Sequence, residues 1–336
     1  MKDSRCQERD AILDMLRIVA TIGVVVIHMT DLNSWHGLLL NTVARFSVPV
    51  FFMLSGYCML SSPIPRAKLN GKCLGLLGRA LLWSCIYFMY SVSSGALRWR
   101  GDISSFLDYL LEYPVHLWYI YALVGLYLFL PAYFAFAQNV SKREYKITLL
   151  LLFLLGSLTT TLIRAGTADA VELVLSRAKM PYLLGMPFMF LLGGYLQRYL
   201  DIERVSCTVL CSLSCILVTL TVVGARVLQF RGLPKDALLS FFSPLIVMYG
   251  IVVFILFLKL SERYVITGKA GACIEEFVKA TMGVYFVHLL LRDCLHFSPG
   301  DYNLVQSLGS VVCLYLVSTF AVWVLQRIPL IRKLVS

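Results

Sequence analysis

The sequence is dominated by apolar stretches long enough to cross a bilayer, separated by short polar and basic segments. A transmembrane helix needs about 20 predominantly apolar residues. We therefore interpret the chain as one all-α domain over residues 1–336, a polytopic membrane protein with about ten transmembrane helices. The predicted spans cover approximately residues 11–32, 38–60, 73–95, 116–136, 145–164, 182–199, 205–225, 238–259, 274–296 and 303–326.

Two further segments carry local signals. Residues 102–113 place Phe106, Leu107, Leu110 and Leu111 among acidic side chains, which is typical of an amphipathic helix lying in the membrane interface. The sixth predicted span is short and contains several glycines and a proline, so we expect its helix to be irregular.

The composition excludes a soluble protein. The chain is 59% hydrophobic and 15% charged, whereas soluble domains carry about 25% charged and about 45–50% apolar residues. The net charge of +11 does not predict nucleic acid as a partner, because the basic residues form short runs between apolar stretches. About twice as many loop Lys and Arg residues lie on the side of the N-terminus as on the other, which predicts that both termini are cytoplasmic.

Ionisable side chains at membrane depth are costly, so each is a candidate functional residue. In the first span, Arg17 and His28 are eleven residues apart, which places them on one helix face about 16 Å apart along the axis. Asp14 lies near the same stripe, one turn before Arg17. A polar stripe therefore connects the two ends of this helix.

Counting residues along the predicted spans places the other charged side chains at two depths in the membrane. Arg79 and Lys279 fall near the level of Arg17, and this cationic group suits a phosphate-rich ligand. The alternative for Arg79 and Lys279 is that they extend to the membrane surface without contacting a ligand.

A second group lies nearer the opposite membrane face. Arg45 and His288 fall near the level of His28, with His116 at the mouth of the fourth span. A histidine beside a cation suits general-base chemistry in which negative charge develops. Arg292, next to Asp293 near a helix end, is expected to be structural.

Several motifs resemble those of acyltransferase family 3. Arg17 and His28 match its arginine-x10-histidine spacing, and RFSVPVFFMLSGY at residues 45–57 matches a second motif. HLWY at 116–119 and GVYFVH at 283–288 are further matches. The resemblance therefore extends over nearly the whole chain.

The resemblance implies a membrane enzyme of the bacterial plasma membrane that moves an acyl group, commonly acetyl, from cytoplasmic acyl-CoA to a hydroxyl of a cell-surface or lipid-linked glycan. It implies that His28 is the catalytic histidine and that Arg17 binds the acyl donor. Acetyl-CoA would be a co-substrate, and we expect no bound cofactor and no metal.

Further roles follow as hypotheses. Arg45 would stabilise the oxyanion and Asp14 would position Arg17, while Arg79 and Lys279 would add to the donor site. The candidates on the acceptor side are His116, Trp118, Tyr119, Tyr285 and His288.

Two other functions remain open from the sequence. Residues 48–57 also resemble the membrane domain of the vancomycin-resistance serine racemases, which favours an amino-acid transporter as the alternative. A membrane scaffold is the third interpretation. The acceptor, the acyl chain length, a covalent acyl-histidine and the oligomeric state are left undetermined by the sequence.

Overall fold

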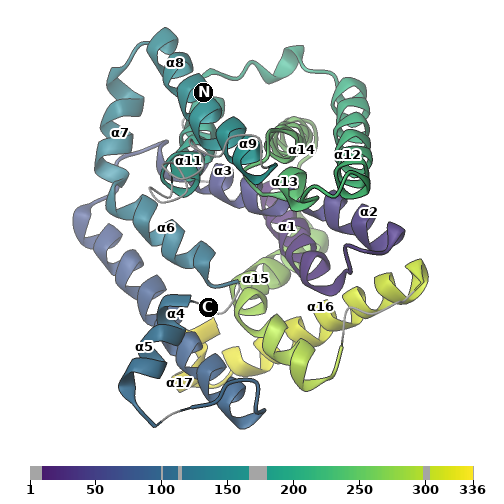
Figure 1. The fold of residues 1–336 in the computed structure, drawn as a ribbon. Helices are drawn as coiled ribbons and strands as arrows, with labels where there is room; N and C mark the ends of the chain where they lie inside the picture. The colour runs from purple at the N-terminus through teal and green to yellow at the C-terminus, as the bar shows by residue number, and fades with distance from the viewer. Residues whose placement is uncertain (1–9, 100, 113–115, 166–179, 298–302, 336) are drawn as a thin grey trace. The chain divides into compact units, whose positions relative to one another are not determined.

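The computed structural model describes residues 10–99, 101–112, 116–165, 180–297 and 303–335, and every regular element in these ranges is helical (Figure 1). The elements are α1 (Ala11–Met29), α2 (Trp35–Ala44), α3 (Ser47–Met59), α4 (Arg66–Ser93), α5 (Ile103–Glu112), α6 (Trp118–Leu128), α7 (Leu130–Asn139), α8 (Lys142–Phe153), the π-helical turn η1 (Leu154–Leu158), α9 (Thr159–Arg164), α11 (Met180–Tyr199), the 3-10 turn η2 (Ile202–Arg204), α12 (Cys207–Phe230), α13 (Asp236–Leu239), α14 (Pro244–Arg263), α15 (Gly268–Cys294), α16 (Leu304–Gln326) and α17 (Pro329–Val335).

The prediction of an all-α polytopic membrane protein is confirmed, with fewer candidate spans than the ten expected. Within the described residues, seven helical segments are long and apolar enough to cross a membrane, or up to eight if a bent pair counts as one span. The other two expected spans, 182–199 and 274–296, form α11 and α15. Gly and Pro residues lower the hydropathy of α11, and the apolar half of α15 includes Lys279, Arg292 and Asp293.

The bent pair corresponds to the fourth expected span. Helices α6 and α7 meet at Phe129 with an angle of 57° between them. Pro131 follows this break, and proline both lacks a backbone N–H and disfavours helical geometry in the residue before it. The proline therefore accounts for a bend where the hydropathy pattern alone predicts a straight helix.

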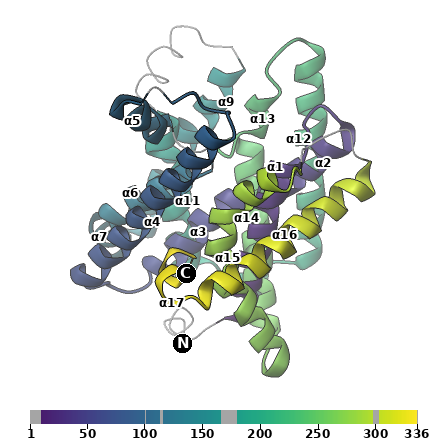
Figure 2. The same cartoon turned by 90° about the horizontal axis from the view of Figure 1, so that it is seen from below.

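The chain forms two compact units. The first comprises Met1–Ser61 and Phe136–Ser336, and the second comprises Ser62–Ala135. In the first unit, α1 packs against α2, α3, α14, α15 and α16, and α15 runs beside α16 (Figures 1 and 2). In the second unit, α4 packs against α5 and α6. The single domain expected over residues 1–336 stays a prediction.

The second unit contains the expected amphipathic helix. It is α5, and the rings of Phe106 and Tyr109 lie 5.0 and 5.3 Å from the ring of Phe88 on α4. Asp102 lies just before α5, where hydrogen bonds from the Ser105 and Ser104 hydroxyls hold the pKa of its carboxyl below the usual range. The apolar side of α5 thus packs on α4 by ring contacts.

Glycines allow α3 and α11 to approach closely. A Cβ on Gly56 would lie 1.7 Å from the Phe190 carbonyl oxygen, and a Cβ on Gly193 would lie 2.0 Å from that of Met53. Small residues of this kind let membrane helices pack backbone to backbone. The expected irregularity of the sixth span is not observed, because α11 is continuous through Pro187.

We predict that Gly56→Ala lowers the thermal unfolding temperature in detergent, because the added methyl group meets backbone rather than a movable side chain. The cost of such overpacking is about 1–3 kcal/mol or more. Gly125→Ala in α6 is the control, since none of the described heavy atoms lies within 4 Å of its Cβ position. Equal unfolding temperatures for the two variants would contradict this account of the α3–α11 contact.

Candidate functional site

The first half of α1 holds an ion pair. The Asp10 side chain accepts hydrogen bonds from the backbone amides of Ile12 and Leu13 and so begins the helix. One turn further, Arg17 Nη1 donates to Asp14 Oδ1 over 2.5 Å. The Asp14 side chain is buried, whereas the Arg17 side chain is 36% exposed. The buried carboxylate therefore holds a guanidinium group that stays partly exposed.

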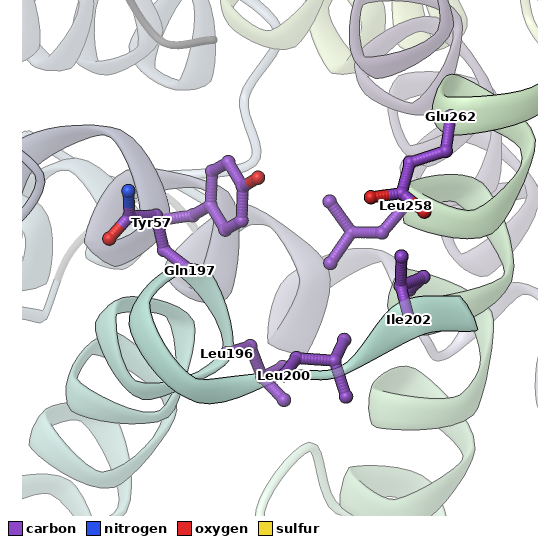
Figure 3. Close-up of a pocket in the computed structure, with 7 residues that line it drawn as sticks. All are labelled: Tyr57, Leu196, Gln197, Leu200, Ile202, Leu258 and Glu262. Atoms are coloured by element: carbon purple, nitrogen blue, oxygen red, sulfur yellow. The ribbon is translucent and has the colours of Figure 1, made fainter. Parts of the chain in front are cut away.

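Two cavities lie near this end of α1. Figure 3 shows the first, which has Tyr57 and Gln197 on one side and Leu258, Ile202 and Glu262 on the other, with about 340 Å³ of open space. Tyr57 precedes Cys58, whose Sγ lies 3.8 Å from Arg17 Nη2.

The second cavity is larger, with about 1200 Å³ of open space, and it extends from Asp10 to residues 264–267. Glu262 lines both cavities. Open space thus adjoins Asp10 and the first residues of α1, one helical turn before Asp14.

At the other end of α1, the His28 ring lies beside the ring of His288 on α15. The ring centroids of His28 and His288 are 5.4 Å apart, and the two ring planes are inclined by 44°. His288 is fully buried, and its Nδ1 lies 3.0 Å from the Val284 carbonyl oxygen and 2.9 Å from that of Tyr285. Because a carbonyl oxygen can only accept, these contacts place a proton on Nδ1 of His288.

The backbone that carries His28 is bonded by three side chains. The carbonyl oxygen of His28 accepts from Arg292 Nη1 over 3.2 Å, and that of Ile27 accepts from Asn41 Nδ2 over 3.1 Å. The carbonyl oxygen of Val26 accepts from the Thr30 hydroxyl over 2.8 Å. The last carbonyl groups of a helix have no partner inside it. Side chains supply those partners here and fix the turn that bears His28.

Arg45 ends α2 beside this turn. Its Nε donates to Asn41 Oδ1 over 2.8 Å, its Nη1 donates to the Leu239 carbonyl oxygen, and its guanidinium lies 5.0 Å from the centre of the Phe241 ring. Arg45 is joined to the last turn of α1 through Asn41, and Arg292 is bonded to that turn directly. Two imidazoles and two guanidinium groups are therefore gathered at this end of α1.

Arg292 forms an ion pair with Asp293, with Nε and Nη2 both 2.7 Å from Asp293 Oδ1. Its bond to the His28 carbonyl could not be read from the sequence. Asn41 is a further site residue that was not predicted from the sequence. The available signal was an uncharged amide one helical turn before Arg45, inside an apolar stretch.

The remaining candidates of the first unit lie on α15. The Lys279 side chain is 52% exposed, and its Nζ is 2.8 Å from Glu275 Oε1 and 3.0 Å from Glu276 Oε1. Two carboxylates therefore pair with this ammonium group, and the predicted donor role of Lys279 stays a prediction. The Tyr285 ring centroid is 6.4 Å from that of His288.

The other candidates belong to the second unit. Arg79 lies half-buried on α4. The His116 ring is buried 5.0 Å from the Tyr87 ring, and the Trp118 and Tyr119 rings are 6.4 Å apart. The predicted donor role of Arg79 and the acceptor roles of the other residues stay predictions.

The comparison with protein families decides the class of protein. A family model described as an acyltransferase domain, that of acyltransferase family 3, matches residues 10–327. The chain belongs to the acyltransferase 3 family. This match covers segments of both compact units and every candidate residue named above. Comparisons with curated proteins and with solved structures gave no match.

As a member of the acyltransferase 3 family, the protein is a multi-pass membrane acyltransferase, and it acts on an acyl donor and an acyl acceptor. Within the described ranges, no group of three or more His, Cys, Asp or Glu side chains is arranged to hold a metal ion.

We predict that the His288 ring carries a proton on Nδ1, because two backbone carbonyl oxygens accept from that atom. Selective ¹⁵N labelling of the five histidines, with His288→Gln to assign the signal, measures this by NMR. His288→Gln should also shift the His28 signal, whereas His36→Gln should remove its own signal and leave that of His28 in place. A ring protonated at Nε2 alone would contradict the assigned hydrogen bonds.

Proposed function

We propose that this acyltransferase moves an acetyl group from cytoplasmic acetyl-CoA to a hydroxyl group of a cell-surface or lipid-linked glycan, in the bacterial plasma membrane. The observation that carries the proposal is that one unbroken helix, α1, holds the Asp14–Arg17 ion pair near one end and His28 at the other. With both termini cytoplasmic, as the distribution of Lys and Arg predicts, the Arg17 end faces the cytoplasm.

The Arg17 end suits the nucleotide part of the donor. A guanidinium group forms paired, charge-assisted hydrogen bonds with phosphate oxygens. Arg17 is held in one orientation by Asp14 while remaining partly exposed, and open space adjoins this end of the helix. We therefore assign the binding of a CoA phosphate to Arg17 and its positioning to Asp14.

The His28 end suits the transfer step. Eleven helical residues span about 16 Å, a length that the extended pantetheine arm of CoA can cover. His28 takes the proton of the acceptor hydroxyl as its oxygen attacks the thioester carbon. Arg45 stabilises the tetrahedral oxyanion. The intermediate then collapses, the carbon–sulfur bond breaks, the new ester is left on the acceptor, and the CoA thiolate takes the proton from His28.

The first test is release of CoA and labelling of a glycan product by the reconstituted protein supplied with labelled acetyl-CoA. We expect His28→Ala to reduce CoA release by about 10²-fold or more, the usual contribution of a general base. His36→Ala is the matched control, since His36 lies at the start of α2, outside the imidazole pair. It should retain the rate of the wild-type protein.

Arg17→Ala should instead raise the KM for acetyl-CoA, because it removes donor binding at the opposite end of α1. Transfer that is equally fast with and without His28, in folded protein, would contradict the scheme. Absence of donor binding and turnover with several acyl-CoA species and glycan acceptors would contradict the function itself. Uptake of amino acids would then be measured, because the transporter interpretation predicts it.

A further inference from the structure

Asn41 is buried at 1% exposure on α2, and its amide group joins two parts of the site. Its Oδ1 accepts from Arg45 Nε over 2.8 Å. Its Nδ2 donates to the Ile27 carbonyl oxygen over 3.1 Å and to the Thr30 hydroxyl over 2.9 Å. The amide oxygen is thus bonded to the guanidinium group of Arg45, and the amide nitrogen is bonded to the end of α1.

The bonds to α1 act on the turn that carries His28. Ile27 is the residue before His28, and Thr30 is the C-cap residue of the helix. The Thr30 hydroxyl accepts from Asn41 and donates to the Val26 carbonyl, so one chain of hydrogen bonds passes from Arg45 through Asn41 to this turn. A change in the Asn41 side chain therefore acts on Arg45 and on the backbone around His28 at once.

We propose that Asn41 is a positioning residue that sets the placement of Arg45 relative to His28. The inference rests on the proposed function, in which His28 is the base and Arg45 stabilises the oxyanion. An oxyanion stabiliser is effective only when it is held in advance where the charge develops, and a displacement of about 1 Å can cost about 10²-fold in rate. Asn41 supplies that fixed geometry without touching the substrate.

The chemistry of the side chain explains why an amide is needed. A carboxylate at this position would accept hydrogen bonds from Arg45 but would have no proton to donate to the Ile27 carbonyl. A leucine has nearly the same shape and removes all three bonds. Asn41→Leu is therefore the informative variant, because it changes the bonding more than the volume.

Thr42 offers a matched control. It is the next residue on α2 and fully buried, and its hydroxyl donates to the Leu38 carbonyl of its own helix over 2.8 Å. Thr42→Val thus also removes a buried hydrogen bond on α2, but one that reaches neither Arg45 nor α1. Any effect specific to Asn41→Leu then arises from the bonds that join the two parts of the site.

The kinetic test uses the full-length protein in lipid, with acetyl-CoA as donor. Asn41→Leu should lower kcat roughly 10- to 100-fold while the KM for acetyl-CoA changes less than about twofold, because the Arg17 end is untouched. Thr42→Val should change neither quantity. In an Arg45→Met background, Asn41→Leu should cause a smaller loss of kcat than it does in the wild-type protein, because only its effect on the His28 turn remains. Additive losses would overturn the proposal, since they would mean that Asn41 does not act through Arg45.

Hydrogen–deuterium exchange gives a readout that does not depend on activity. Asn41→Leu should speed exchange of the amides of Val26–Thr30, because the turn loses its bonds to α2, whereas Thr42→Val should leave them as in the wild-type protein. If Asn41→Leu does not fold, Asn41→Ser, which is smaller and uncharged, takes its place with the same expectations.

The outcomes separate this inference from the proposed function. If His28→Ala is inactive but Asn41→Leu matches the wild-type protein in kcat and in exchange, the role of Asn41 is overturned and the proposed function stands. If His28→Ala keeps full transfer, or if the wild-type protein transfers nothing, the proposed function fails and the positioning role fails with it. Unchanged amide exchange in Asn41→Leu would contradict a stabilising role for the bonds from Asn41 to α1, whether or not the proposed function holds.

Discussion

The carbonyl groups in the last turn of α1 need hydrogen-bond partners that the helix itself cannot provide, and in a membrane protein these must come largely from other side chains. Thr30, Asn41 and Arg292 provide them. Two of these side chains also bond to charged neighbours, Asn41 to Arg45 and Arg292 to Asp293. The side chains that bond the last carbonyl groups of α1 therefore also hold the charged groups around His28 in place. The candidate site depends on that arrangement.

The parts of the site that could be predicted from sequence are those determined by a single helix. The spacing of Arg17 and His28, and the approach of Asp14 to Arg17, follow from helix geometry once α1 is recognised as apolar and unbroken. Counting residues from the membrane surface also placed His288 near the level of His28, and their rings lie 5.4 Å apart. The positions of polar residues along a helix therefore indicate how deep their side chains lie in the membrane.

Contacts between helices were not predictable in the same way. The spacing of Asn41 and Arg45 allows a bond between them within one helix, but the bond from Asn41 to the Ile27 carbonyl oxygen depends on how α2 packs against α1. The bond from Arg292 to the His28 carbonyl oxygen likewise depends on how α15 packs against α1. The structural role of a glycine in a span is equally hard to predict, because it depends on which helix packs against it. Those of the sixth span suggested an irregular helix, yet Gly193 lies in a continuous helix and allows a close backbone contact with Met53 of α3.

The bond between Arg292 and the His28 carbonyl joins residues 264 positions apart in the chain. During synthesis α1 enters the membrane early, whereas α15 is made only after most of the other helices. At about 5–20 residues per second, the turn that bears His28 waits roughly 13–50 s for this partner. A nascent or prematurely terminated chain therefore carries both Arg17 and His28 before Arg292 is present to bond the His28 carbonyl oxygen.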